Sequence, residues 1–229
     1  MDGLLAVIAG LTSTAFTVDL AQAYRRRTRP HTAAYAVGMA MFAVATWALA
    51  FGLTSGWNGA SYRAFFLFGA ILNIPYLALG SMYLVVGRRA GTVMFIIVGA
   101  ITAISVTLTT TVGFAAPLPA GGIPHDIFPP ISEGFGPRLL AAIGGGTGAT
   151  VIIVLSVVSI FRFWKTNRRL VAGNVLITAG TLAAGGGGTG LAIGEGAAFA
   201  LSLLVAAALI WAGYRLATGA RRAIVPSAA

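Results

Sequence analysis

The residues best suited to contact a ligand lie in the apolar stretch from residue 64 to residue 86. Asn73 places an amide at the centre of this stretch, and Pro75 removes a backbone N–H donor and bends a helix. Tyr76 and Ser81 add hydroxyl groups nearby. Polar groups inside an apolar helix are typical of binding sites. A kinked helix whose amide bonds to a neighbouring backbone explains the same residues without a ligand.

Three residues outside this stretch join the candidates. Trp47 and Trp211 complete the predicted ligand-binding set, each on its own apolar segment. Asp19 is the one acidic residue well inside an apolar segment, where a carboxylate is typical of an ion or proton pathway. The alternative interpretation is a salt bridge that holds the basic loop in place. We prefer this alternative, because arginines follow from Arg25 onwards.

The segment from residue 113 to residue 137 holds the remaining chemically interesting groups. His125, Asp126 and Glu133 are residue types that bind metals, or that would act in a membrane-embedded, lipid-modifying enzyme. One histidine and two acids in a proline-rich loop are usually solvated. We therefore assign no catalytic residue and no metal site.

Several cofactor and enzyme classes are excluded by the residue inventory. The chain has no cysteine, hence no disulfide and no cysteine-ligated metal cluster. Its two histidines, His31 and His125, lie at opposite boundaries and cannot face each other across a haem. The single lysine, Lys165, lies between apolar segments, so a retinal Schiff base inside a helix is excluded. No GxSxG or HExxH motif occurs, and we expect no cofactor.

The composition indicates an integral membrane protein. Hydrophobic residues make up 58% of the 229 residues and charged residues 9%, and the mean hydropathy is +0.90, which leaves too little charge to cover a soluble globule. The net charge of +10 is concentrated in short runs between apolar segments. There it sets topology and meets anionic lipid, so we expect membrane lipids as partners and no nucleic acid.

We predict an all-α fold with seven transmembrane helices, the N-terminus outside and the C-terminus in the cytoplasm. The expected spans are residues 3–24, 32–53, 64–86, 92–112, 139–161, 170–187 and 197–216. All Lys and Arg residues except Arg63 and Arg138 then lie on the cytoplasmic side. Arginine in place of lysine, with abundant Ala and Gly, is typical of a high-G+C bacterial genome, which suggests a bacterial cytoplasmic membrane.

Loop charges suggest an internal duplication within the single membrane domain. The first and fifth segments are each followed by a loop with four basic residues, and the third and seventh each end in Gly and Arg-Arg. This pattern predicts parallel three-helix repeats at residues 1–91 and 138–223, a linker helix at 92–112 and an external loop at 113–137. Alternating basic loops also arise in any seven-helix protein, so both interpretations stay open.

Glycines suggest two local features. Gly144 and Gly148 are four residues apart, a spacing that lets two helices approach closely. Four consecutive glycines at 185–188 weaken a helix by roughly 1 kcal/mol each relative to alanine, so we expect the sixth helix to unwind there, near Glu195.

These features favour a non-enzymatic membrane protein that binds or moves a small neutral or apolar molecule, such as a lipid or isoprenoid, between the second, third, sixth and seventh helices. Two alternatives remain. One is an accessory subunit of a larger membrane complex, with membrane protein partners. The other is the lipid-modifying enzyme mentioned above.

Overall fold

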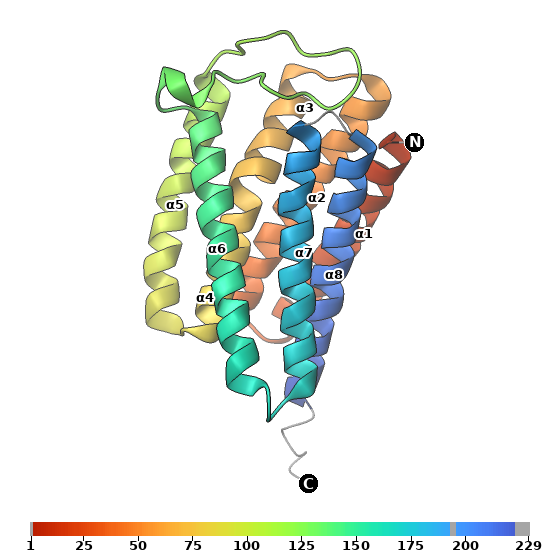
Figure 1. Ribbon diagram of the computed structural model, residues 1–229. Helices are drawn as coiled ribbons and strands as arrows, with labels where there is room; N and C mark the ends of the chain where they lie inside the picture. Colours follow the sequence, from red (N-terminus) through yellow and green to blue (C-terminus); the bar gives the residue numbers. More distant parts are fainter. Residues whose placement is uncertain (1, 193–195, 223–229) are drawn as a thin grey trace.

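The protein is a bundle of long, roughly aligned helices (Figure 1). The structure is a computed structural model that describes residues 2–192 and 196–222, and this part of the chain contains no strand. Its elements are α1 (Asp2–Arg26), α2 (Pro30–Ser55), α3 (Gly59–Ala64), the π-helix η1 (Phe65–Leu72), α4 (Asn73–Val85), α5 (Arg88–Thr111), the 3₁₀ helix η2 (Ile131–Glu133), α6 (Pro137–Phe163), α7 (Arg168–Ala192) and α8 (Gly196–Arg222).

The predicted all-helical architecture is confirmed for the described residues. Within the described residues, six helical segments are long and apolar enough to cross a membrane, with α3, η1 and α4 forming one continuous segment from Gly59 to Val85. Helix α7 is similar in length, at 25 residues, but is not among these six. A seventh spanning helix and the orientation in a membrane therefore stay predictions.

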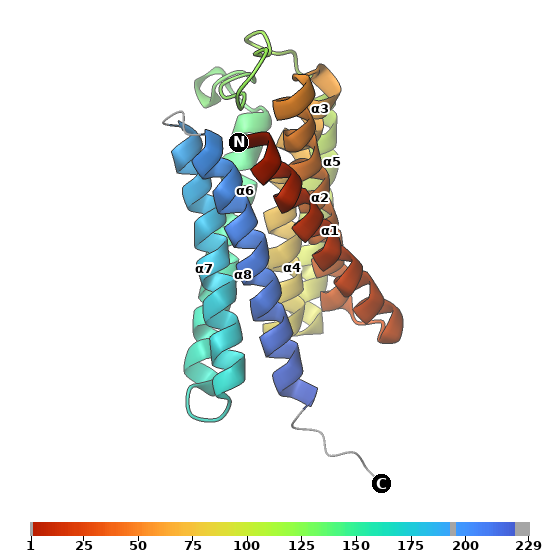
Figure 2. The same cartoon turned by 90° about the vertical axis from the view of Figure 1, so that its right-hand side faces the viewer.

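All long helical segments except α5 form a closed ring in chain order, and this ring includes α7. Helix α1 packs on α2, α2 on η1 and α4, α4 on α6, α6 on α7, α7 on α8, and α8 returns to α1. Helix α5 lies outside this ring, against α4, η1 and α6. We call the end with the N-terminus and the long 112–136 connection the cap end, and the opposite end, where α1, α4, α6 and α8 finish, the basic end (Figures 1 and 2).

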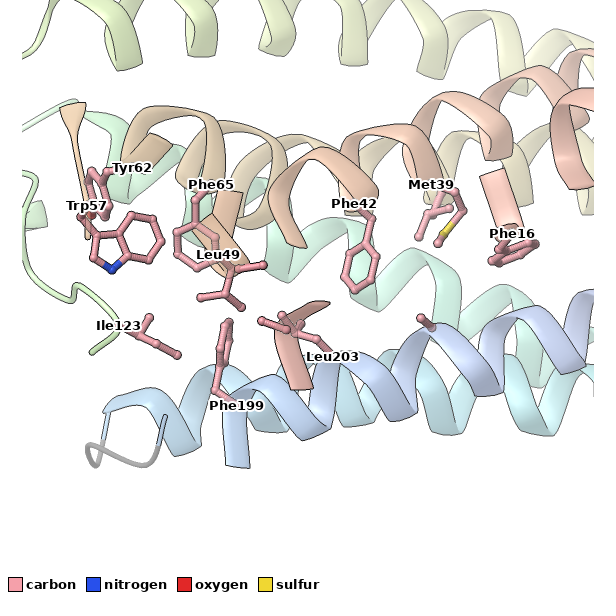
Figure 3. Packing of buried hydrophobic residues seen from close by; sticks show 14 of the residues in the cluster. Phe16, Met39, Phe42, Leu49, Trp57, Tyr62, Phe65, Ile123, Phe199 and Leu203 are labelled. Atoms are coloured by element: carbon pink, nitrogen blue, oxygen red, sulfur yellow. The ribbon is translucent and has the colours of Figure 1, made fainter. Parts of the chain in front are cut away.

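Large apolar side chains fill the middle of the ring. Phe42, Leu49 and Phe65 come from α2 and η1, and Phe199 and Leu203 come from α8 (Figure 3). All five are less than 10% exposed, and the rings of Phe65 and Phe199 meet edge to face with centroids 6.2 Å apart. We call this surface, where α1, α2 and α4 meet α6, α7 and α8, the seam.

Prolines and a capping residue explain where several helices begin. Pro30 and Pro137 occupy the first turn of α2 and α6, where a missing N–H costs nothing. Asn58 begins α3 with a capping box, because its side chain accepts from the N–H of Ser61 while the Ser61 hydroxyl accepts from the Asn58 N–H.

The irregular centre of the third segment is a π-helix that precedes Pro75. The N–H of Asn73 donates to the carbonyl of Phe68, five residues back, instead of to the usual position four residues back. Pro75 has no N–H to offer the Ile71 carbonyl, and that oxygen turns toward α6, 2.8 Å from where a Cβ on Gly144 would lie. The proline therefore acts together with a widened turn, which sequence alone does not indicate.

Glycines let helices touch at two places. A Cβ on Gly148 would lie 2.8 Å from a side-chain carbon of Ile74, so the close approach predicted for Gly144 and Gly148 is confirmed, and their partner is α4. Gly173 on α7 and Gly213 on α8 face each other, with Cβ positions 2.7 Å and 2.6 Å from the opposite backbone oxygen.

The predicted unwinding of the sixth helix is wrong, because α7 continues through the glycine run to Ala192. Close packing on α8 occurs earlier in α7, at Gly173 and Gly180, and not at Gly185 or Gly186. In apolar surroundings an unwound turn would leave backbone groups unpaired, and this penalty outweighs the low helix propensity of glycine. The prediction for Glu195 falls outside the described residues.

The connection between α5 and α6, residues 112–136, folds over the cap end; we call it the cap. Trp57 donates its indole N–H to the carbonyl of Gly122 at 2.7 Å. Phe128 is 0% exposed, and its ring centroid lies 5.0 to 5.5 Å from those of Tyr62, Phe66 and Phe114. The rings of Tyr62 and Phe114 are themselves 5.6 Å apart. The predicted long loop is thus an ordered lid with apolar residues in the core.

Arg63 joins the cap to the helices below it. Its guanidinium donates to the backbone carbonyls of Thr109 and Val112, at the end of α5, where a helix leaves carbonyls unpaired. The same group lies 4.5 Å from the ring centroid of Phe114. One arginine therefore binds the end of α5 and the first residues of the cap.

Candidate functional site

Asn73 and Pro75 lie in a helix–helix contact. Asn73 is 3% exposed, and its side-chain oxygen accepts a hydrogen bond from the N–H of Ile74 at 2.7 Å. Pro75 packs against Gly144 and Gly148 of α6. Pro75 serves the contact between α4 and α6, whereas the backbone carbonyl of Asn73 lies against Gly38 of α2. The predicted ligand role of both residues stays a prediction.

Tyr76 and Trp47 turn toward other neighbours. The hydroxyl of Tyr76 pairs with that of Thr102 on α5 at 3.3 Å. Trp47 is 41% exposed, donates its indole N–H to the Thr14 hydroxyl at 3.1 Å, and covers Gly10 on α1. The residues predicted as one ligand-binding set are thus distributed over several helix contacts.

Ser81, Trp211 and Asp19 do come together, through residues that sequence reasoning missed. We call this group, at the seam near the basic end, the aromatic cluster. Its members come from α1, α2, α4 and α8, and are Phe16, Asp19, Tyr35, Ser81, Trp211, Tyr214 and Arg215.

Stacked rings form the body of the aromatic cluster. The ring of Phe16 lies nearly parallel to that of Trp211, with centroids 5.8 Å apart, and 5.7 Å from the ring of Tyr214. Tyr35 meets Tyr214 edge to face at 6.4 Å. Phe16 is 2% exposed, whereas Tyr35, Trp211 and Tyr214 are half-buried. Such rings offer flat apolar surface with polar groups at the edge.

Asp19 is the polar centre of the cluster. One carboxylate oxygen accepts from the indole N–H of Trp211 at 2.9 Å and from Nε of Arg215 at 3.0 Å. The guanidinium of Arg215 also lies 5.6 Å from the ring of Trp211. The carboxylate is therefore matched by a cation of the same chain, so the cluster presents little net charge to a ligand.

Tyr35 and Ser81 join α2 to α4 on the opposite side of the cluster. Their hydroxyl oxygens are 3.0 Å apart, and Ser81 also donates to the carbonyl of Leu77 at 3.1 Å.

Spacing in the sequence held a signal for the missed residues. Trp211, Tyr214 and Arg215 are three and four residues apart, which places them on one face of a helix, and Phe16 and Asp19 share a face for the same reason. Tyr35 has no such signal, because its place depends on how α2 is rotated against α4 and α8.

The cap-end candidates are placed differently. Asp126 forms an ion pair with Arg138, 2.6 Å apart, and His125 lines a pocket of about 560 Å³ together with Asp2, Ile123 and Ile127. Among the described residues, no group of three or more His, Asp or Glu side chains is arranged to hold a metal ion. Glu133, the third candidate, is exposed at the end of η2.

The hydroxyl-bearing face of α5 is buried against its neighbours. Thr102 bonds back to the carbonyl of Val98 at 2.7 Å. Ser105 and Thr109 are 0% exposed, and within the described residues their hydroxyl oxygens have no hydrogen-bond partner.

In comparisons with known proteins, no protein-family model, no curated protein and no solved structure matches the chain.

Proposed function

We propose that the chain is a multi-pass protein of a bacterial cytoplasmic membrane that binds or moves a small neutral or apolar molecule, of the lipid or isoprenoid kind, along the seam. In this proposal seven helices cross the membrane, with the cap end outside and the basic end in the cytoplasm. The position of nearly all Lys and Arg residues at the basic end supports this orientation.

The ring of helices supports a two-part organisation. The first three and the last three segments each form a consecutive set, and the ring order is the one that a twofold axis along the bundle would give. Helix α5 lies outside the ring, as expected of a linker between repeats 1–91 and 138–223. The two sets are the parts that would move against each other.

The observation that carries the proposal is the apolar character of the seam. Phe42, Leu49 and Phe65 meet Phe199 and Leu203 there without any hydrogen bond among these side chains (Figure 3). Of the two ion pairs among the described residues, Asp19–Arg215 crosses the seam near the basic end and Asp126–Arg138 lies at the cap. An apolar molecule could replace such side-chain contacts at little cost, whereas an ion would meet no compensating charge.

The two edges of the seam are held by different kinds of contact, and in this proposal the seam opens at one of them. Helices α4 and α6 touch closely at Gly144 and Gly148, which provides a fixed edge. At the other edge, α1 and α8 are joined by the aromatic cluster, and the cap covers the far end. We assign the ligand contacts at the basic end of the seam to Ser81 and Trp211.

Photoaffinity labelling tests this proposal without knowledge of the natural ligand. The protein is reconstituted in phosphatidylcholine with a trace of an isoprenoid alcohol that carries a diazirine, and labelled peptides are mapped by mass spectrometry. We expect saturable label on the seam, at Leu49, Phe199 and Leu203. Label confined to the outward face of α5, at Phe95 and Ile96, would show bulk membrane contact only and would contradict the proposal.

One observation favours the accessory-subunit alternative. Helix α5 packs on one side only, and its outward side chains are largely exposed, including Val93, Phe95, Ile96 and Ile97 at 49 to 66%. Purification in a mild detergent distinguishes the two functions. A partner retained at fixed stoichiometry and released by Phe95→Ser with Ile96→Ser supports the subunit, and a monodisperse free protein contradicts it.

A further inference from the structure

The turn between α6 and α7 is one of two clusters of four exposed cations at the basic end; the other is formed by Arg25, Arg26, Arg27 and Arg29. We call residues 161–169 the α6–α7 hairpin. It contains four exposed cations, Arg162, Lys165, Arg168 and Arg169. Within the described residues none of them is in an ion pair, and the sequence has no acidic residue between Glu133 and Glu195. Their charge is therefore available to a partner.

Large apolar side chains accompany these cations. Phe161 is 78% exposed and Trp164 63% exposed, within the same few residues as Arg162 and Lys165. An aromatic ring beside cations is typical of the boundary between hydrocarbon and headgroups, where the ring is half in each layer. Binding of a nucleic acid or an acidic peptide would account for the cations but would not explain the exposed apolar ring of Phe161.

The α6–α7 hairpin holds a defined shape. The N–H of Asn167 donates to the carbonyl of Phe163 at 2.9 Å, and the side-chain oxygen of Asn167 accepts from the N–H of Leu170 at 3.0 Å. Asn167 thus closes the turn and caps α7. The four cations therefore lie within eight consecutive residues of an ordered turn.

Helix length places the α6–α7 hairpin at the level of lipid phosphates. Helix α6 has 27 residues; at about 1.5 Å per residue a helix of this length is roughly 40 Å long, more than the hydrocarbon thickness of about 30 Å. The hairpin also reaches farther along the bundle than the turn between α4 and α5 (Figures 1 and 2). It therefore extends past the acyl chains.

We propose that the α6–α7 hairpin is a binding site for anionic phospholipid, with its four cations on the phosphate-bearing headgroup and with Phe161 and Trp164 against the glycerol and upper acyl chain. The inference uses the membrane-spanning part of the proposed function and is independent of any ligand in the seam. The binding free energy comes mainly from charge, because each Lys or Arg near an anionic surface adds to it.

Native mass spectrometry of the protein released from nanodiscs measures the lipid preference. Discs contain phosphatidylcholine with or without phosphatidylglycerol. The test variant is Arg162→Gln, Lys165→Gln, Arg168→Gln, Arg169→Gln, and the matched variant removes the same number of charges by Arg25→Gln, Arg26→Gln, Arg27→Gln, Arg29→Gln. We expect the hairpin variant to lose the preference for phosphatidylglycerol by about tenfold or more, and the matched variant to keep it.

Two outcomes of this comparison overturn the proposal. One is an unchanged preference in the hairpin variant; the other is an equal loss in the matched variant, which would indicate a diffuse field of the whole basic end. Inorganic phosphate at the lipid's concentration should not displace the lipid, and displacement would assign the cations to a free anion. A chain that fails to enter nanodiscs contradicts the membrane-spanning function itself, while absent seam labelling leaves this test intact.

A measurement on the unmodified protein removes any dependence on variant folding. Lys165 is the only lysine, so its acetylation by a water-soluble reagent can be followed at one peptide. Phosphatidylglycerol in the disc should slow this acetylation severalfold relative to phosphatidylcholine alone. Equal rates in the two lipids would overturn the proposal.

Discussion

Trp211 of α8 donates its indole N–H to the carboxylate of Asp19 on α1 across 2.9 Å, and so joins the last helix of the bundle to the first. The two residues are 192 positions apart in the sequence. This contact closes the ring of helices near the basic end, at the edge of the seam that we propose to open.

Replacement of Trp211 by Phe tests the strength of that contact. The ring stacking on Phe16 persists while the hydrogen bond to Asp19 is lost, and we expect the unfolding free energy to fall by about 1 kcal/mol, as for hydrogen bonds between membrane helices. Trp47→Phe is the matched control, because Trp47 loses a bond to a neutral hydroxyl on an exposed face. An equal or larger effect at Trp47 would contradict this assignment.

Asp19→Asn separates structural from catalytic or transport roles for the carboxylate. An amide oxygen can still accept from Trp211, but the ion pair with Arg215 is lost, so we expect a lower unfolding temperature with retained ligand labelling of the seam. Thermal unfolding in detergent and the photoaffinity assay measure the two effects. A variant of normal abundance and stability that no longer binds the probe would assign Asp19 to function.

Gly144→Ala should weaken the contact between α4 and α6. A Cβ at this position would lie 2.8 Å from the Ile71 carbonyl, which is backbone and cannot move aside freely, so we expect a loss of about 1 to 3 kcal/mol. Gly146→Ala, on the same helix with nothing within 4 Å, should instead be neutral or stabilise by up to about 1 kcal/mol. The order of the two unfolding temperatures checks the prediction, and the reverse order refutes it.

Phe128→Ala should loosen the cap. Phe128 is 0% exposed among three aromatic rings, and truncation of such a residue costs about 3 to 5 kcal/mol. We expect this loss to fall mainly on the free energy that holds the cap against the helices. Limited proteolysis between residues 112 and 136 is the measurement, and faster cleavage is expected. Phe135→Ala, where the ring is 60% exposed, serves as control and should leave the cleavage rate unchanged.

Charge and apolar length predicted much of the architecture. The apolar segments correspond to helices, and Pro30 and Pro137 begin two of them, because proline is favoured in the first turn of a helix. The π-helix before Asn73 was not predictable, since its wider turn reflects how Ile71 and Pro75 pack on α6.

The glycine run led to a wrong prediction of unwinding in α7, because backbone hydrogen bonds keep the helix intact in apolar surroundings despite low glycine propensity.

The candidate site was predictable only in part. Ser81, Trp211 and Asp19 meet in the aromatic cluster, but Tyr35 and Tyr214, which connect them, were not foreseen. Side chains that converge from four helices depend on the rotation and tilt of each helix, and these are set by neighbours and not by local sequence. The fold of the cap was equally inaccessible, because it depends on Phe128 finding rings from α3, η1 and the cap itself.

Cross-linking across the seam tests the central claim most directly. The chain has no cysteine, so Phe65→Cys with Phe199→Cys can be joined by a short, reducible bifunctional reagent, and Thr14→Cys with Trp47→Cys provides a control pair within one set of helices. Uptake and binding of the diazirine isoprenoid are then compared before and after reduction. We predict that only the seam cross-link abolishes them and that reduction restores them; undiminished uptake and binding with the seam cross-linked would contradict the account.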